Sequence, residues 1–240
     1  MATIKEKDFI EIEYVGKLKE DGSIFDATDE KVAKDNEIYN PDMNYGPVVI
    51  CVGEGHVIKG LDNFLVGKDT GEYKVEIKPE EGFGKKNPKL LKLMPTNIFL
   101  KQQIQPMPGL QVTLDGIMGT IRSVTGGRTL VDFNHPLSGR MLVYDVKVLR
   151  NVEDDKEKLY SFMSLQFGKK HLEVDLNEGK ATVKVRIEVP KKMKEALSEK
   201  VRELIPTITE ISFEKKEAEK KKEKKEEKEE TKAEPENKAE

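Results

Sequence analysis

The sequence has few of the residues that metal and thiol chemistry require. Its 240 residues include a single cysteine and three histidines, which lie far apart in the chain. One cysteine excludes an internal disulfide, and Cys51 stands in the apolar run PVVICVG, where we expect a buried, inert thiol. The motifs HExxH and CxxC do not occur, so we expect no metal site and no cofactor.

Long apolar runs are also absent. No stretch approaches the ~20 apolar residues of a membrane-spanning helix, and the first residues, MATIKEKDF, lack the apolar core of a signal peptide. The formal net charge of −3 gives no reason to expect nucleic-acid binding. We therefore expect a soluble, cytoplasmic protein that binds neither membranes nor nucleic acids.

Charged residues gather instead at the C-terminal end. Residues 214–240 contain 10 Lys and 11 Glu among 27 residues. Such a composition cannot bury enough apolar surface to form a core. We predict a disordered, solvated tail whose opposite charges nearly cancel.

Apolar and polar residues alternate in several segments, which is typical of half-buried strands. After the turn residues Glu20, Asp21 and Gly22, a short strand is expected to begin at residues 23–26. The other strands are expected at residues 8–18, at 47–55, within 71–84, where Pro79 ends the strand, and at 139–152.

Helical spacing is found between two of these strands. A short amphipathic helix that Gly67 ends has one apolar face, formed by Val57, Ile58, Leu61, Phe64 and Leu65. The polar residues 33–46, which include an Asn-Pro pair, predict a long loop.

Two further units differ in pattern from these segments. Residues 85–129 are rich in proline and place strands around an Asp-Gly turn and a Gly-Gly turn, which indicates a small β-rich unit. Beyond it and the last strand, the order α-β-β-α-β indicates an α+β unit. Its elements are expected at residues 153–167, 171–189 (a hairpin), 190–205 and 207–214.

The stretch GSIFDAT raises a question because it sets an aromatic ring, Phe25, directly beside a carboxylate, Asp26. On local pattern alone, Phe25 would belong to a core and Asp26 to a turn or a helix cap. A pocket wall that binds an apolar group and offers one polar atom would require both.

Chemistry that requires only a pocket fits this sequence, because it has no nucleophile elbow and no dinucleotide-binding motif. Rotation about an X–Pro amide is such a reaction, since its barrier of ~18–20 kcal/mol comes from resonance in the C–N bond. An apolar cavity with one or two polar groups favours the twisted amide over the charge-separated planar form.

Four sequence blocks carry a family resemblance: YVGKLKEDGSIFDAT, VGEGHVIKGLDNFLVGK, EGFGKKN and HPLSGRMLVYDVKVL. In this order they resemble the FKBP-type peptidyl-prolyl cis-trans isomerases, whose fold is an antiparallel β-sheet half-wrapped around a short helix. The segment between EGFG and HPLSG resembles the chaperone domain in the flap of SlyD-like members. The C-terminal α+β unit resembles that of the long archaeal members.

The resemblance implies an α+β protein of four parts. These are an isomerase domain at 1–84 and 130–151, an inserted flap chaperone domain at 85–129, a C-terminal α+β domain at 152–213, and the tail at 214–240. The implied activity is isomerisation of X–Pro bonds in unfolded or nascent polypeptides, combined with the holding of unfolded chains.

Site residues also follow from the resemblance. The Tyr14 hydroxyl would lie near Asp26, and the Ile58 backbone N–H would bind a substrate carbonyl. Two positions depart from the family: Phe83 replaces Tyr, and Leu61 replaces the Trp of the best-known eukaryotic members. The implied catalytic residues are Tyr14, Phe25, Asp26, Ile58, Phe83 and Tyr144, and the implied substrate-binding residues are Val57, Leu61, His135 and Leu137.

In the inserted segment, we expect clients to bind to an exposed strand edge and to apolar side chains that accept many sequences. The residues expected to contact clients are Ile98, Phe99, Leu100 and Met107.

Alternatives remain at this point. The changes at Leu61 and Phe83 keep open a binding-only holdase or ribosome-associated chaperone with a vestigial isomerase pocket. A nickel-binding function is disfavoured, because the tail contains neither His nor Cys. The helix expected at 190–205 has more apolar surface than a lone small unit needs, which allows a homodimer through the C-terminal domain.

Overall fold

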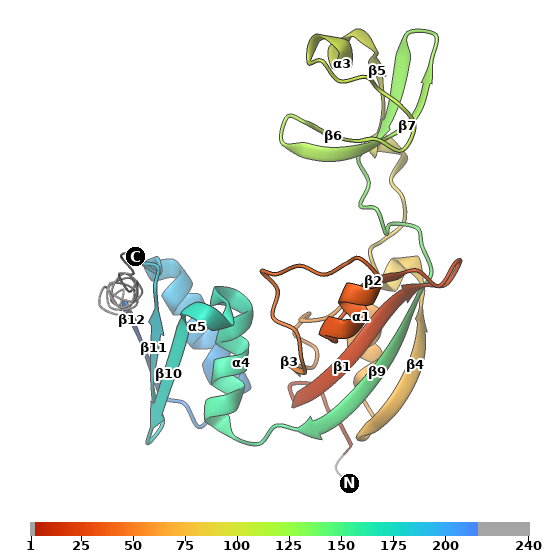
Figure 1. The fold of residues 1–240 in the computed structure, drawn as a ribbon. Coiled ribbons are helices and arrows are strands. Elements are labelled where there is room, and N and C mark those ends of the chain that lie inside the picture. Colours follow the sequence, from red (N-terminus) through yellow and green to blue (C-terminus); the bar gives the residue numbers. More distant parts are fainter. Residues whose placement is uncertain (1–2, 216–240) are drawn as a thin grey trace, which may run out of the picture. The chain divides into compact units, whose positions relative to one another are not determined.

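The computed structural model describes residues 3–215, and they form two compact units that meet between Asn151 and Val152 in the chain (Figure 1). The tail predicted from residue 214 lies outside the described residues except for Glu214 and Lys215. These two residues belong to the last strand, so that strand extends slightly further than expected.

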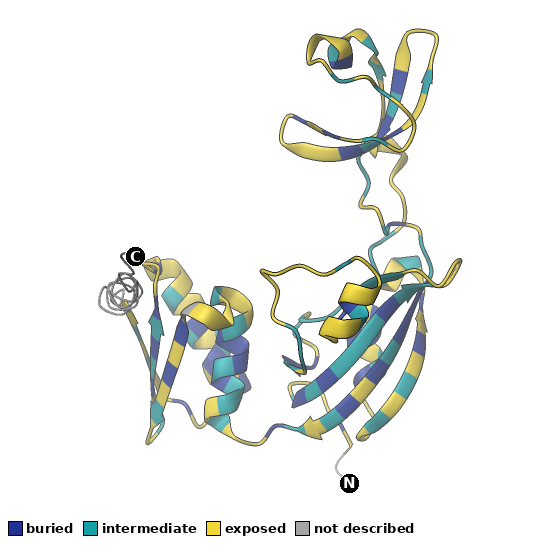
Figure 2. Ribbon diagram, viewed as in Figure 1, coloured by how far each residue is buried: buried dark blue, intermediate teal, exposed yellow. Residues whose placement is uncertain are grey.

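The first unit contains a twisted antiparallel sheet whose strands come from distant parts of the sequence. Its order is β2-β1-β9-β4, and β3 also pairs with β1. Burial alternates along these strands, as the sequence pattern predicts (Figure 2). The strands are β1 (Phe9–Leu18), β2 (Ile24–Ala27), β3 (Val48–Cys51), β4 (Gly71–Ile77) and β9 (Leu142–Asn151).

Helix α2 (Lys59–Leu65) packs against this sheet, but it begins after Val57 and Ile58, which the sequence pattern had included in its apolar face. Leu61 and Leu65 are fully buried in the same hydrophobic cluster as Ile77 at the end of β4. Gly60 makes the close approach possible, because a Cβ at that position would stand 2.6 Å from the Ile77 side chain. A short 3-10 turn, η1 (Pro79–Glu81), follows β4.

A helix occupies part of the segment that the sequence assigned to a loop. Helix α1 (Glu30–Asp35) begins after Asp29, whose carboxylate accepts a hydrogen bond from the Val32 N–H at 2.9 Å. An ion pair between Glu30 and Lys34, one turn apart, adds to its stability. The loop predicted from residue 33 therefore starts only after α1.

A β-bulge explains the Phe25–Asp26 pair. In the pairing of β2 with β1, Lys17 faces Ile24 and Gly16 faces Asp26, so Phe25 is the extra residue. Neighbouring side chains on a regular strand point to opposite faces, whereas a bulge re-aims one of them. Both side chains thus serve the same site.

The inserted segment forms its own small sheet, in the order β5-β8-β7-β6, around a separate hydrophobic cluster. The sequence placed the end of this segment at residue 129, but β8 continues to Asp132 and Val131 is fully buried in the small cluster. The predicted boundary therefore cuts through a strand. The elements are η2 (Pro88–Leu90), β5 (Leu91–Pro95), α3 (Asn97–Lys101), β6 (Gln111–Leu114), β7 (Ile117–Thr125) and β8 (Arg128–Asp132).

The second unit has the predicted α-β-β-α-β order. Its sheet runs β10-β11-β12, with an antiparallel hairpin and a parallel final pair. Helix α5 buries Leu197, Val201 and Leu204. The elements are α4 (Asp155–Phe167), η3 (Lys169–His171), β10 (Leu172–Asn177), β11 (Lys180–Val185), α5 (Lys191–Leu204) and β12 (Glu210–Lys215).

Among the helices between residues 3 and 215, none is both long enough and apolar enough to cross a membrane.

The close contact at Gly60 generates a prediction. Gly60→Ala should lower the free energy of unfolding by about 1–2 kcal/mol, because overpacking against Ile77 outweighs the helix-propensity gain of ~1 kcal/mol. Denaturant unfolding measures the change, with Asn63→Ala, at an exposed position of the same helix, as the matched control. A Gly60→Ala protein as stable as the control would contradict the packing described.

Candidate active site

A cavity of about 410 Å³ lies between α2 and the concave side of the larger sheet. Most of the predicted pocket residues meet there, although β1, β2, α2 and β9 bring them from distant parts of the chain. The residues that line it are Tyr14, Asp26, Gly55, His56, Val57, Ile58, Leu61, Phe83 and Tyr144.

Aromatic rings form one wall of the cavity. The Phe25 ring meets Tyr144 at 5.8 Å between centroids and Phe83 at 6.3 Å, in both cases edge to face. Tyr14 meets Tyr144 at 5.7 Å. Such edge-on pairs add to the stability that burial alone provides. Phe25 therefore packs against two residues that line the cavity but is not itself among the lining residues.

Gly16 is a site residue that the sequence reasoning missed. A Cβ there would stand 2.9 Å from Phe25 Cζ and 3.1 Å from Tyr144 Cε1, so only glycine leaves room for both rings. Glycine weakens a strand interior and often marks a close approach. Its place inside the predicted strand was the available signal.

Asp26 supplies the carboxylate at the cavity. Burial raises the pKa of Asp26 above its ordinary value, and a hydrogen bond from the Tyr14 hydroxyl opposes part of that rise. Burial, followed by the charge of Asp26, raises the pKa of both Tyr14 and Tyr144, so both hydroxyls stay protonated. The cavity is therefore a largely apolar space with one desolvated carboxylate and two hydroxyl groups.

The segment between β3 and α2 forms the opposite rim. Asp62, which is only 6% exposed, accepts hydrogen bonds from the backbone N–H groups of Gly53 at 2.8 Å and Gly55 at 3.2 Å. His56 lines the cavity, and its Nδ1 accepts the Cys51 N–H at 3.0 Å. The sequence reasoning gave none of these side chains a role except Cys51, which is buried as expected.

His135 stacks on Phe83, which lines the cavity, and Leu137 contacts His135. The His135 ring stacks on Phe83 at 4.6 Å between centroids with an interplanar angle of 3°. The Leu137 N–H donates to His135 Nδ1 at 3.2 Å. Neither residue is among those that line the cavity, and their expected contact with substrate stays a prediction.

Three of the residues expected to bind clients lie on α3, and the fourth, Met107, lies between α3 and β6. The expectation for Phe99 is wrong for the folded insertion, because its side chain is 0% exposed at the centre of the small cluster. Ile98 is half-buried against that cluster, whereas Leu100 and Met107 are 53% and 54% exposed.

A second cavity, of about 500 Å³, lies beside α1 and the strands β1, β9 and β4. Its walls are rich in charged side chains that pair with one another, such as Lys147 with Glu72 at 3.0 Å. Of the site residues implied by the family resemblance, only Tyr14 lines this second cavity. Most of these residues meet at the cavity that contains Asp26. Between residues 3 and 215, His, Cys, Asp and Glu side chains form no group of three or more that could hold a metal ion.

The chain is similar to two family models and to several known proteins. A family model described as FKBP-type peptidyl-prolyl cis-trans isomerase matches residues 1–105, and one described as FKBP26, IF domain, matches residues 92–137. The short-type peptidyl-prolyl cis-trans isomerase of Methanocaldococcus jannaschii is 36% identical over 146 residues, which are 60% of this chain and 92% of that protein. SlyD of Helicobacter pylori is 28% identical over 165 residues, 66% of this chain and 80% of that protein. An FKBP-type 16 kDa isomerase of Escherichia coli is 30% identical over 112 residues, 44% of this chain and 74% of that protein.

The raised pKa of Asp26 predicts how stability depends on pH. A raised pKa means that the folded protein binds the proton more tightly, so stability is lost as pH rises through the folded pKa. Asp26→Asn removes this loss and should raise the free energy of unfolding at pH 7. The difference should shrink as pH falls below the ordinary value of 3.8, where the carboxyl is protonated in both states. Thermal unfolding of both proteins from pH 3 to pH 7 measures it, and a variant less stable at pH 7 would contradict the electrostatics described.

Proposed function

The chain belongs to the FKBP-type peptidyl-prolyl cis-trans isomerases, and from this premise we propose that the cavity at Asp26 holds a substrate proline and promotes rotation about its X–Pro bond. The observation that carries the proposal is an aromatic cavity in which a single half-buried carboxylate receives a hydrogen bond from Tyr14. A ring of proline size fits in about 410 Å³.

The cavity acts on the electronic structure of the amide. In the planar amide, resonance moves charge from nitrogen to oxygen, and twisting returns the lone pair to nitrogen. An apolar wall such as Tyr144 and Leu61 solvates the charge-separated planar form poorly and so favours the twisted one. The Ile58 N–H holds a substrate carbonyl, while Asp26 and Tyr14 orient the segment beside the twisting bond.

We also propose that the insertion holds unfolded or nascent chains near this cavity. It exposes large apolar side chains, and its sheet has edge strands at β5 and β6. Unpaired strand edges and adaptable methionines suit many extended sequences. The exposed residues are Leu91, Leu93, Leu100, Met107, Ile117 and Met118.

The remaining proposals concern assembly and compartment. Leu165, Ile187 and Met193 of the second unit are 42%, 60% and 36% exposed, which supports a homodimer through this unit. Sedimentation equilibrium tests it, and a monomer at all concentrations would refute it. One buried cysteine suits a reducing compartment, so we assign the protein to the cytoplasm.

Substitutions at the carboxylate test the proposed catalysis. Asp26→Ala should lower kcat/KM for Ala-Xaa-Pro-Phe tetrapeptides about tenfold or more, because the half-buried carboxylate orients the substrate. Tyr14→Phe should lower it less, since one hydrogen bond is worth ~0.5–1.5 kcal/mol. Protease-coupled isomerisation assays measure both, and circular dichroism verifies folding. Wild-type rates from a folded Asp26→Ala protein would exclude this cavity as the active site.

Removal of the insertion tests whether the cavity isomerises prolines while the insertion binds unfolded chains. Residues 91–131 can be replaced by a Gly-Asn-Gly turn, because the Phe133 N–H already donates to the Leu90 carbonyl at 3.0 Å. Tetrapeptide isomerisation should stay within about threefold, because the cavity residues lie outside the excised segment. Catalysis of a proline-limited refolding reaction should fall at least tenfold, because the local concentration of client prolines is lost.

The control for the excision is Leu93→Ser/Leu100→Ser in the intact chain, which removes exposed apolar surface without shortening it. It should reduce refolding catalysis and spare the tetrapeptide. Equal losses on both substrates would make the insertion part of the active site. A protein that delays aggregation but catalyses neither reaction would instead be a binding-only holdase.

A further inference from the structure

The two segments that join the small sheet to the larger one are held together by polar contacts. We call these segments, residues 83–90 and 133–139, the neck. At one end of the neck, the Phe133 N–H donates to the Leu90 carbonyl at 3.0 Å, and at the other end the Gly139 N–H donates to the Gly84 carbonyl at 2.8 Å. The neck is thus a paired structure and not two separate linkers.

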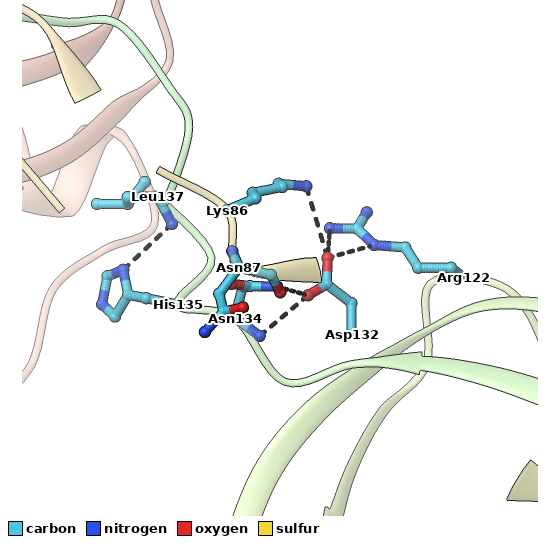
Figure 3. A network of polar contacts seen from close by, with 7 residues as sticks. All are labelled: Lys86, Asn87, Arg122, Asp132, Asn134, His135 and Leu137. Carbon is cyan, nitrogen blue, oxygen red and sulfur yellow. Dashed lines mark hydrogen bonds and ion pairs between the residues drawn. The ribbon is translucent and has the colours of Figure 1, made fainter. Parts of the chain in front are cut away.

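Asp132 lies at the entry of the neck, at the end of β8 (Figure 3). Its side chain is 3% exposed, and both of its oxygens accept hydrogen bonds. Oδ2 accepts from Arg122 Nε at 3.1 Å and Nη2 at 2.9 Å, and lies 3.5 Å from Lys86 Nζ. Oδ1 accepts from the Asn134 N–H at 2.9 Å and Nδ2 at 2.8 Å. A buried carboxylate is tolerated only when it is satisfied in this way.

The surroundings of Asp132 stabilise its ionised form. Burial alone would raise the pKa of Asp132, but the hydrogen bonds from Asn134 and Arg122 and the charge of Lys86 lower it to about 2. The carboxylate is therefore ionised at neutral pH, and its hydrogen bonds to Asn134 are charge-assisted, which makes them stronger than neutral ones.

Asn134 connects Asp132 to the other segment of the neck through hydrogen bonds. Its Oδ1 accepts the Asn87 N–H at 2.7 Å, and its Nδ2 donates to the Asn87 carbonyl at 3.1 Å. Side chains that satisfy backbone groups on both sides fix the two segments in one register. Asn134 is thus fixed by Asp132 on one side and by Asn87 on the other.

The next residue, His135, contacts the cavity wall. Its ring lies flat on Phe83 at 4.6 Å, and its Nδ1 accepts the Leu137 N–H at 3.2 Å. Ser138 completes this turn: its N–H donates to the His135 carbonyl at 2.9 Å, and its hydroxyl donates to the Phe83 carbonyl at 3.0 Å. Phe83 is held at its ring and at its backbone by residues 135–138.

Resting on the prolyl cavity proposed above, we propose that His135 is a positioning residue for isomerisation, and that the Asp132–Asn134 hydrogen bonds hold its ring against Phe83. Phe83 has no hydroxyl with which to fix its ring by a hydrogen bond, so packing must do so. His135 covers one side of that ring and Phe25 meets it edge-on. The base of the insertion and the cavity wall are in this way one connected structure.

Four variants test this inference on a tetrapeptide, which is too short to need the insertion. Asp132→Asn keeps the size of the side chain but presents an amide NH2 to the donors around it. His135→Ala removes the stacked ring, and His135→Phe restores a flat ring without Nδ1. Asp115→Asn is the charge-matched control, because Asp115 is exposed at the β6–β7 turn of the same insertion.

Asp132→Asn and His135→Ala should each lower kcat/KM about three- to tenfold, while His135→Phe and Asp115→Asn should stay within twofold of the wild type. The double variant Asp132→Asn/His135→Ala should be no worse than His135→Ala alone, because both changes act through the same contact. A further readout is the chemical shift of the Phe83 ring protons, which the stacked His135 ring displaces. Asp132→Asn should move these shifts toward those of His135→Ala.

Wild-type kcat/KM and unmoved Phe83 shifts in Asp132→Asn would overturn the inference, and so would an equal loss in Asp115→Asn. If the wild-type protein itself had no isomerase activity, the proposed function would fail. The Phe83 shifts in Asp132→Asn would then still decide whether the neck positions the ring.

Discussion

The site depends on one close contact, the packing of the Phe25 and Tyr144 rings over Gly16. Gly16 pairs with Tyr144 on β9 and faces Asp26 on β2, so a single position touches the strands on both sides. The β-bulge at Phe25 places that ring over the glycine and leaves the next side chain, Asp26, at the cavity. Adjacent residues therefore supply the ring that packs against the aromatic wall and the carboxylate that lines the cavity. On a regular strand their side chains would point to opposite faces.

Two carboxylates of the first unit, Asp26 and Asp132, differ in their surroundings. Burial raises the pKa of Asp26, which means that its ionised form is less favourable there than in water. An apolar side chain of similar size would stabilise the fold more. Asp132 shows the opposite arrangement: it is more deeply buried, but enough donors surround it to lower its pKa. Asp132 connects to Asn134 through its hydrogen bonds, whereas Asp26 is the carboxylate for which we propose a role in isomerisation.

Much of the fold and of the candidate site could be predicted from the sequence, because the periodicity of apolar residues and the order of the motifs can be read directly from it. The FKBP-type family and the α+β class are confirmed, and most of the family-matched residues meet at one cavity. The failures share a physical cause. Whether Phe99 faces its cluster or the solvent and where β8 ends both depend on contacts between distant segments, which no local pattern contains.

The most direct test of the central claim is an NMR titration of the wild-type protein with an Ala-Xaa-Pro-Phe tetrapeptide. Exchange spectra should show catalysed interconversion of the cis and trans proline signals. The largest amide shifts should occur at Ile58, Asp26 and Tyr144, which line the cavity. Largest shifts at Glu72 and Lys147, beside the charged cavity, or an absence of catalysed exchange, would contradict the account.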